Sequence, residues 1–371
     1  MTTLPLRADL VGIAPYGAPE DRVPVRLNVN ENPYSPAPEI IADIADSVTR
    51  AATDLNRYPD RDFPALRAAL ADYLTTESHV TVDPQCVWAA NGSNEVMLHL
   101  FQAFGGPGRV ALSFAPTYAM YPEYARDTNT GWVVGTRGED FSLDVAQVEA
   151  ALQQHRPSLL VLASPNNPSG TALPPGDLAQ IVHAAQSSGP DIDGQPSATI
   201  VIVDEAYGEF RREGVPSALE TTRGCDHVVV TRTMSKAFAM AGLRLGYMVA
   251  PRPIIDAVAV VRLPYHLSAI TQAVALAALR HAPQLMAQVA DLRRERDELV
   301  DWLEERGLRA CESDANFVLF GPIDNRDAVF QALLDRGILI RVVGPPGWMR
   351  VSIGTPDEML AFKNALTEVL P

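Results

Sequence analysis

Between residues 86 and 250, short apolar runs alternate with stretches of helical pattern. Continuous apolar runs rich in β-branched residues are typical of strands buried on both faces of a sheet. Their alternation with helices favours a largely parallel sheet, because parallel neighbours need a crossover connection. The pattern therefore predicts an α/β domain on a seven-stranded, mostly parallel sheet, with strands in CVWAA, RVALSF, GWVV, SLLVLA, ATIVIVD, HVVVT and LGYMVA.

The chain before this region has a different composition and periodicity. The first 35 or so residues are rich in Pro and Asn without a sustained period, which indicates an extended arm. Helical patterning begins after Pro38 and is clearest in DFPALRAALADYL, where Asp62 is expected to be the N-cap. Farther along, residues 188–197 are expected to form a mobile surface loop between a helix and a strand.

The pattern changes again beyond Ala269. A long helical stretch ends at Gly307, which is expected to be its C-cap. A strand in ANFVLF, a helix in AVFQALLDRG, short strands in GILIR and WMRVSIG, and a last helix from Pro356 then predict a small α+β unit. We expect three parts: an N-terminal arm that joins the small domain (1–35), a large domain (36–268) and the small C-terminal domain (269–371).

The composition excludes several classes of protein. A hydrophobic fraction of 47% with 20% charged residues provides a core and excludes intrinsic disorder. The 30 Lys and Arg against 45 Asp and Glu give a net charge of −15, which argues against a nucleic-acid interface. No apolar run approaches the roughly 18 residues that suggest a membrane span.

The compartment is expected to be the cytoplasm. The N-terminal stretch MTTLPLRADLVGIAPYG carries charges and prolines where a signal peptide needs an apolar segment. Cys86, Cys225 and Cys311 are far apart and form no CxxC motif or Cys/His cluster, which indicates reduced thiols and no metal site.

Lysine is nearly absent from the chain. Of the 30 basic residues only Lys236 and Lys363 are lysines. Lys363 lies in the last predicted helix, at a position spaced for the solvent face. Lys236 is therefore the candidate for chemistry that needs an amine, and it follows a predicted strand, where α/β sheets bind their ligands.

Three other strand ends carry polar side chains: residues 91–94 (NGSN), 164–170 (SPNNPSG) and 204–207 (DEAY). Taken singly, each also fits a turn or a helix cap. Together they match a phosphorylated pyridine aldehyde, which needs an amine, an acid against its ring nitrogen, donors to its phenolate oxygen, and a helix N-terminus with a cation for its phosphate. The residues that could meet these needs in turn are Lys236, Asp204, Asn167 with Tyr207, and Gly92, Ser93 and Asn94 with Ser235 and Arg244.

Motifs along nearly the whole chain carry a family resemblance. They are RLNVNENPYSP, RYPD, NGSNEV, PTYAMY, SPNNPSG, VDEAYGEF, TRTMSKAFAMAGLRLGY, VRLPYHLS, SDANFVLF and RVSIGTPDE. The chain resembles the fold-type-I pyridoxal-phosphate aminotransferases, and among them most the histidinol-phosphate aminotransferases. The resemblance implies pyridoxal 5′-phosphate as cofactor.

The resemblance also implies roles for residues around the cofactor ring. Lys236 would form the Schiff base and shuttle the proton, and Asp204 would pair with the pyridine nitrogen. Tyr207 and Asn167 would donate to the phenolate oxygen, and Tyr118 would stack on the ring.

For the phosphate, the resemblance implies Ser235, Arg244 and the backbone amides of Ser93 and Asn94. Tyr58, from RYPD, would reach the phosphate of a partner subunit, which implies a homodimer. On the substrate side, Arg350 matches the arginine that binds the α-carboxylate of the amino donor. The other positions that match the substrate pocket are Arg341, Asn32, Tyr16 and Tyr265.

The resemblance implies a ping-pong transamination in histidine biosynthesis. It interconverts L-histidinol phosphate plus 2-oxoglutarate and imidazole acetol phosphate plus L-glutamate. The turn reads NNPSG where Thr is more usual before Gly, which is a conservative change. The stretch VVGPPGWM between Arg341 and Arg350, which helps to shape the pocket, is short and apolar, so the acceptor stays open. The nearest alternative is an aromatic amino acid (phenylalanine) aminotransferase. A pyridoxal-phosphate decarboxylase or lyase is a second, and a ligand-sensing module of a regulator a third, although we expect no room for its DNA-binding domain before Asp9 or after Pro371.

Overall fold

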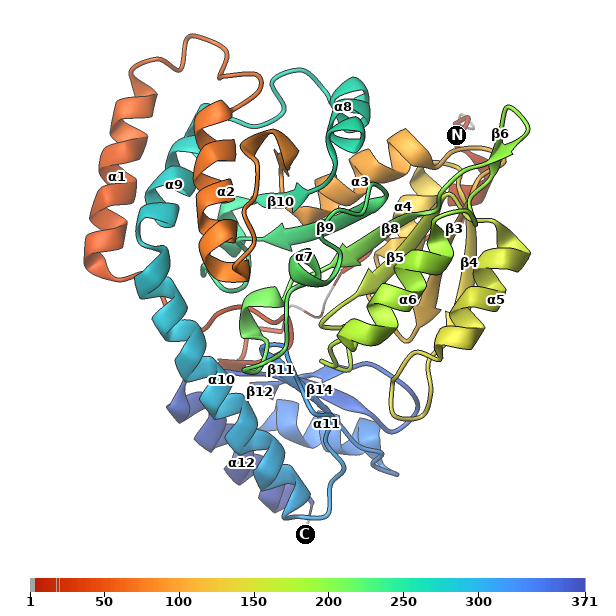
Figure 1. Ribbon diagram of the computed structural model, residues 1–371. Helices are drawn as coiled ribbons and strands as arrows, with labels where there is room; N and C mark the ends of the chain where they lie inside the picture. The colour runs from red at the N-terminus through yellow and green to blue at the C-terminus, as the bar shows by residue number, and fades with distance from the viewer. Residues whose placement is uncertain (1–3, 18, 20, 371) are drawn as a thin grey trace.

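The computed structural model describes residues 4–17, 19 and 21–370. A seven-stranded sheet in the order β2-β10-β9-β8-β5-β3-β4 lies at its centre (Figure 1). Only β10 runs antiparallel to its neighbours β2 and β9, while the other pairs are parallel. The predicted mostly parallel sheet is thus confirmed, with strands β2 (Val87–Ala90), β3 (Val110–Ala115), β4 (Gly131–Thr136), β5 (Leu159–Ala163), β8 (Ile200–Asp204), β9 (Val228–Thr233) and β10 (Gly246–Val249).

Helices cover both faces of this sheet. Figure 1 shows α5 and α6 in front of it and α3 and α4 behind it. Every residue of β2, β5 and β9 is buried, which explains why β2 and β5 read as unbroken apolar runs, whereas β9 also carries Thr231, Arg232 and Thr233. The covering helices are α3 (Ser93–Phe104), α4 (Tyr121–Asp127), α5 (Val145–His155), α6 (Pro175–Ala185), α7 (Ala218–Thr221) and α8 (Arg252–Val261).

Helices α1 (Pro38–Ala52), α2 (Pro64–Ser78) and α9 (Ala269–Arg280) pack together beside β2 and β10. The expectation that Asp62 caps α2 is wrong. The N-cap is Phe63, at φ +40°, and it makes no side-chain cap. Instead Oδ1 of Asp60 accepts the backbone N–H groups of Asp62 and Phe63, and Asp62 binds Arg61 and Arg262. A positive φ at Phe63 is not a feature that composition reveals.

The long helical stretch after Ala269 is two helices. α9 ends at Arg280 and α10 (Ala282–Glu304) follows, with Pro283 in its first turn. Proline has no backbone N–H to continue the preceding helix, which accounts for the break. The second helix ends at Glu304 rather than at Gly307, although Gly307 does adopt a positive φ of +73°.

The C-terminal part holds a small antiparallel sheet in the order β11-β14-β13, packed with α11 and α12. GILIR contains two strands that join different sheets, because β12 pairs in parallel with β1 of the N-terminal arm. The arm is thereby tied to the C-terminal part, and the division at residues 35 and 268 stays a prediction. The elements are β1 (Val25–Arg26), β11 (Phe317–Phe320), α11 (Arg326–Asp335), β12 (Ile338–Leu339), β13 (Arg341–Val342), β14 (Met349–Ser352) and α12 (Pro356–Val369).

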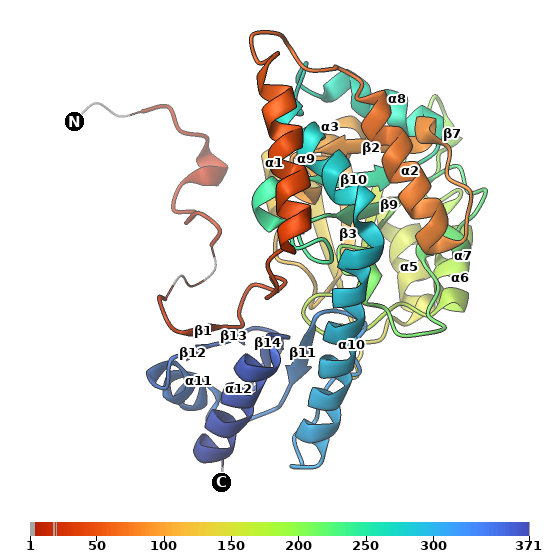
Figure 2. The same ribbon diagram turned by 90° about the vertical axis from the view of Figure 1, so that its left-hand side faces the viewer.

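The remaining segments are short. Residues 188–197 contain a small exposed hairpin of β6 (Asp191–Ile192) and β7 (Gln195–Pro196), where the sequence predicted only a loop. Figure 2 shows the described part of the arm before β1 standing out to one side of the main body, and Nη2 of Arg7 donates to the carbonyl of Arg126 at 3.0 Å. Single turns of 3-10 helix are η1 (Ala8–Leu10), η2 (Pro84–Cys86), η3 (Gly208–Phe210) and η4 (Ala241–Leu243). Across the described ranges, no helix has the length and apolar character needed to cross a membrane.

Candidate active site

A cavity of about 380 Å³ lies at the carboxyl ends of the central strands, between the arm, the large sheet and β13–β14. The site therefore forms where parallel strands end and loops begin, as expected for an α/β sheet. Twelve of the sixteen predicted site residues line it: Tyr16, Ser93, Asn94, Tyr118, Asn167, Asp204, Tyr207, Ser235, Lys236, Arg244, Arg341 and Arg350.

Lys236 supplies the amine of this cavity. Its Nζ donates to the carbonyl of Val29 in the arm at 3.0 Å. Burial, and then the nearby guanidinium of Arg350, lower the pKa of Lys236 to about 8. About a tenth of this amine is therefore uncharged and nucleophilic at pH 7. The other lysine, Lys363, is not on the solvent face as predicted, since its side chain is only 18% exposed and Nζ lies 3.5 Å from Glu295.

Asp204 ends β8 inside the protein. Its Oδ2 accepts from the hydroxyl of Tyr121 at 2.8 Å, and its Oδ1 accepts from Thr231 Oγ1 at 2.9 Å and from the N–H of Ala206 at 3.2 Å. Burial raises the pKa of Asp204, while these three hydrogen bonds act in the opposite direction. The carboxylate is thus fixed in place but short of positive charge, which suits it to pair with a cationic group of a ligand.

Tyr207 and Asn167 contact each other and line the same cavity as Lys236. Nη1 of Arg350 donates to Oδ1 of Asn167 at 2.5 Å. Because a guanidinium only donates, this bond fixes the orientation of the amide, and Nδ2 of Asn167 donates to Tyr207 Oη at 3.4 Å. Both predicted donors therefore belong to one hydrogen-bonded group.

The turn between the end of β2 and the start of α3 forms a concave site. Gly92 has φ +80°, and a Cβ at this position would lie 2.6 Å from Nη2 of Arg244. Glycine is thus required both by the backbone and by the close approach of the guanidinium. The free N–H groups at the start of α3, beginning at Ser93, and the guanidinium of Arg244 together provide an anion site. At the end of β9, Thr233 Oγ1 accepts from the backbone N–H of Ser235 and donates to its hydroxyl oxygen.

Two arginines converge from the small sheet. Arg341 and Arg350 pair directly across β13 and β14, and both line the cavity. Arg350 is buried, its Nη2 donates to the carbonyl of Asn28, and its Nε has no partner among the described residues. Burial lowers the pKa of Arg350 to about 10. A buried guanidinium without a carboxylate partner is a ready site for an anionic substrate group.

Four predicted residues do not line the cavity of this chain. Gly92 lies behind Arg244. Asn32 accepts the N–H of Tyr34 and donates to the carbonyl of Ala237, the latter at 3.5 Å. Tyr58 and Tyr265 stack on each other at the surface.

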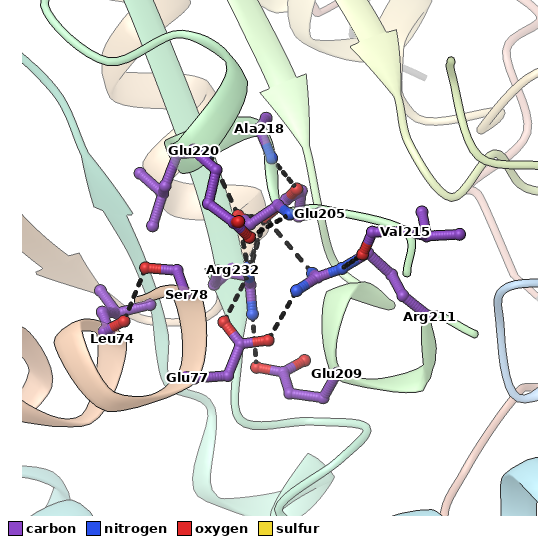
Figure 3. Close-up of polar contacts among 12 residues, drawn as sticks. Leu74, Glu77, Ser78, Glu205, Glu209, Arg211, Val215, Ala218, Glu220 and Arg232 are labelled. Carbon is purple, nitrogen blue, oxygen red and sulfur yellow. Dashed lines mark hydrogen bonds and ion pairs between the residues drawn. The ribbon is translucent and has the colours of Figure 1, made fainter. Parts of the chain in front are cut away.

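Figure 3 shows a buried ion cluster that includes Glu205, the residue after Asp204. Arg232, 1% exposed, contacts Glu205, Glu209 and Glu77 at 2.7, 3.0 and 3.0 Å. Arg211 adds a second guanidinium, 2.7 Å from Glu77. Arg232 lies between Thr231 and Thr233 in β9, whose hydroxyls bind Asp204 and Ser235. The cluster thus anchors the strand ends that carry the site.

Sequence reasoning missed three residues that contact the predicted ones. Tyr121 and Thr231 hold Asp204, and Asn30 donates to Tyr207 Oη at 2.9 Å. The motifs PTYAMY and NVNEN contain Tyr121 and Asn30. Their contacts are 83 and 177 positions apart in the chain, so no local pattern shows them.

Comparison with known proteins agrees with this geometry. Residues 22–366 match the family model of the class I and II aminotransferases. The histidinol-phosphate aminotransferase of Thermobifida fusca (strain YX) is 56% identical over 363 residues, covering 98% of this chain and 95% of that protein. That of Bifidobacterium longum (strain NCC 2705) is 53% identical over 373 residues, covering 99% and 97%.

Solved structures show the same fold. The histidinol-phosphate aminotransferase from Sinorhizobium meliloti in complex with pyridoxal-5′-phosphate has a TM-score of 0.83 at 24% identity, covering 99% of this chain and 98% of that one. An aspartate aminotransferase mutant of Thermus thermophilus has a TM-score of 0.80 at 25% identity, covering 98% and 99%. The fold and the family match together define a class I and II aminotransferase of fold type I. Within that class, the chain belongs to the histidinol-phosphate aminotransferase family.

Proposed function

We propose that the protein transfers an amino group between L-histidinol phosphate and 2-oxoglutarate, giving imidazole acetol phosphate and L-glutamate, with pyridoxal 5′-phosphate as cofactor. The observation that carries the proposal is the arrangement of Lys236, Asp204 and the pair Arg341–Arg350 around one cavity. An amine, a buried carboxylate and two arginines are the groups that this reaction needs.

The residues present fit the cofactor. Asp204 would face its ring nitrogen, Tyr207 and Asn167 its phenolate oxygen, and Tyr118 its ring. The close approach of Arg244 to Gly92 creates a site for its phosphate that a larger residue would fill. When bound, pyridoxal phosphate supplies an electron sink that stabilises negative charge on the α-carbon of an amino acid.

Lys236 is the group that moves protons. With a pKa of about 8, its Nζ is ready both to accept the proton of the substrate α-carbon and to return it. Its hydrogen bond to the carbonyl of Val29 holds it at the cavity wall. Asp204 contributes a fixed negative charge, which favours a protonated nitrogen beside it.

Arg341 and Arg350 explain how one pocket serves two substrates. A guanidinium binds carboxylate and phosphate alike through paired hydrogen bonds. Arg350 would hold the α-carboxylate of glutamate, and Arg341 adds the second cation that a dicarboxylate or a phosphate requires. Glutamate requires the second cation in either activity, so what favours the histidinol phosphate activity over a phenylalanine aminotransferase is the similarity to the histidinol-phosphate aminotransferases.

We also propose that the active form is a cytoplasmic homodimer in which Tyr58 reaches the partner's site. Several large apolar side chains are exposed in the segments around α1–α2 and α8–α9. They are Leu55, Tyr58, Val260, Leu263 and Tyr265. The two segments are joined, since Arg262 donates to the carbonyl of Arg61 and to Asp62. Exposed apolar side chains gathered on one face mark a protein interface.

The test is the absorbance spectrum of the purified protein with pyridoxal phosphate, followed by single half-reactions. Adding L-glutamate or L-histidinol phosphate should convert the yellow form to a colourless one, with release of 2-oxoglutarate or imidazole acetol phosphate, respectively. A protein that stays colourless with the cofactor would refute the proposal. Release of carbon dioxide would instead indicate a decarboxylase.

A further inference from the structure

Asn30 is held rigidly where the arm enters the cavity. The residue is 2% exposed and has φ +56°, a conformation that Asn adopts more readily than most residues. Its backbone N–H donates to Ser352 Oγ at 2.9 Å, and its carbonyl accepts from Nδ2 of Asn316 at 3.1 Å. The position of its side chain is therefore set by the small sheet, not by a ligand.

The side chain of Asn30 links this sheet to Tyr207. Ser352 Oγ donates to Oδ1 of Asn30 at 2.9 Å, and Nδ2 of Asn30 donates to Tyr207 Oη at 2.9 Å. The same phenol oxygen accepts from Nδ2 of Asn167.

This pattern determines where the Tyr207 proton points. A phenol oxygen carries one proton and has two lone pairs for acceptance. Asn30 and Asn167 occupy the acceptor positions of Tyr207 Oη. The hydroxyl proton is left for a partner in the cavity that Tyr207 lines.

We propose that Asn30 is a positioning residue, which acts by keeping the hydroxyl proton of Tyr207 directed at the phenolate oxygen of the cofactor. The inference rests on the proposed function, because it assigns Asn30 a role toward that cofactor. Asn30 touches Tyr207 and not the reacting atoms. Through Asn30, the arm influences the ionisation of the cofactor as well as lining the cavity.

The test is a pH titration of the visible absorbance band of the holoenzyme, which reports the ionisation of the bound cofactor. Asn30→Gly removes the amide while keeping the left-handed backbone free of strain. Loss of a hydrogen bond to the anionic form should raise the pKa of the chromophore by about one pH unit. Tyr207→Phe should raise it in the same direction. In the double variant the two shifts should not add, because Asn30 acts only through Tyr207.

Two further variants sharpen the result. Asn30→Asp keeps the size of the side chain but can only accept, so it should draw the Tyr207 proton to itself and raise the chromophore pKa at least as far as Asn30→Gly. Arg7→Ala removes arm hydrogen bonds to the carbonyl of Arg126 and to Asn129 without touching Tyr207 or the cavity, and should leave the titration unchanged.

The outcomes separate this inference from the proposed function. If Tyr207→Phe shifts the titration and Asn30→Gly does not, or if their shifts add, the role of Asn30 is refuted while the cofactor site stands. If no visible band forms in the parent protein, the proposed function itself fails.

Discussion

The rings of Tyr58 and Tyr265 stack with centroids 4.5 Å apart and an interplanar angle of 16°. The pair lies at the surface, and Tyr58 is 80% exposed. A stacked aromatic pair with so much exposed area is an unusual feature of a free surface. The proposed dimer accounts for it, because a second copy of the chain would cover the pair and receive Tyr58.

Mixing two defective variants tests this arrangement. Lys236→Ala lacks the amine, and Tyr58→Ala lacks the phenol. In a mixed dimer, one site combines Lys236 of one subunit with Tyr58 of the other and is intact. Random reassociation should therefore restore up to about a quarter of the parent activity at limiting cofactor, as expected for a two-fold dimer. If Tyr58 served the site of its own chain, the mixture would recover no activity.

The two lysines provide a matched pair of variants. Lys236→Ala should lose both the visible absorbance with pyridoxal phosphate and turnover, because no other amine lines the cavity among the described residues. Lys363→Ala removes only an ion pair between α12 and Glu295 in α10, and should keep both. Normal turnover in Lys236→Ala would overturn the assignment.

The pKa of Lys236 makes a prediction about stability. In the unfolded chain its amine titrates near 10.5, and in the folded cofactor-free protein near 8. Between these two pH values the unfolded state binds more protons than the folded state. Burial of Lys236 therefore lowers the free energy of unfolding by its full amount below pH 8, and this penalty disappears as the pH rises to 10.5. Each unit of the shift corresponds to about 1.4 kcal/mol.

Replacing the amine should therefore stabilise the protein without cofactor. Lys236→Met should resist urea better than the parent at pH 7, and the gain should shrink as pH rises above 8. A difference that is constant across this range would show that the amine is not kept from protonation by burial.

The ion cluster holds three carboxylates and two guanidiniums, so one carboxylate is in excess. Glu209 is the candidate for the protonated member, because burial raises its pKa more than Arg232 lowers it and its Oε2 has no partner among the described residues. For Glu77, burial also acts to raise the pKa, but Arg232 and Arg211 outweigh it and lower the pKa.

Isosteric amides should distinguish these two residues. Glu209→Gln should change the free energy of unfolding by less than about 1 kcal/mol. Glu77→Gln should cost about 3 kcal/mol, because it leaves two buried guanidiniums undercompensated. Urea unfolding of both variants at pH 7 checks the contrast, and equal losses would contradict it.

The sequence predicted the large sheet because its strands are buried on both faces and read as continuous runs such as SLLVLA. It predicted Lys236 because the chain has only one other lysine. The predictions were weaker for helix ends, where the backbone dihedral angles determine the cap. The cap of α2 depends on φ +40° at Phe63, which composition does not reveal, whereas the break at His281 had a visible signal in Pro283.

The contacts that orient the site residues could not be predicted from the sequence for a different reason. Asn30 and Ser352 lie 322 positions apart and meet because β1 of the arm pairs with β12 of the C-terminal part. Tyr121 points inward to Asp204 from the start of α4. Such side chains are identified by three-dimensional neighbours rather than by spacing.

The most direct test of the central claim is a competition between imidazole acetol phosphate and phenylpyruvate as acceptors, with L-glutamate as donor. With the phosphate held by both Arg341 and Arg350, kcat/KM for the phosphate substrate should exceed that for the aromatic one by at least about a hundredfold, because the carboxylate of phenylpyruvate occupies Arg350 and leaves Arg341 without a partner. Equal values, or a preference for phenylpyruvate, would contradict the assignment of the substrate, while leaving the cofactor contacts in place.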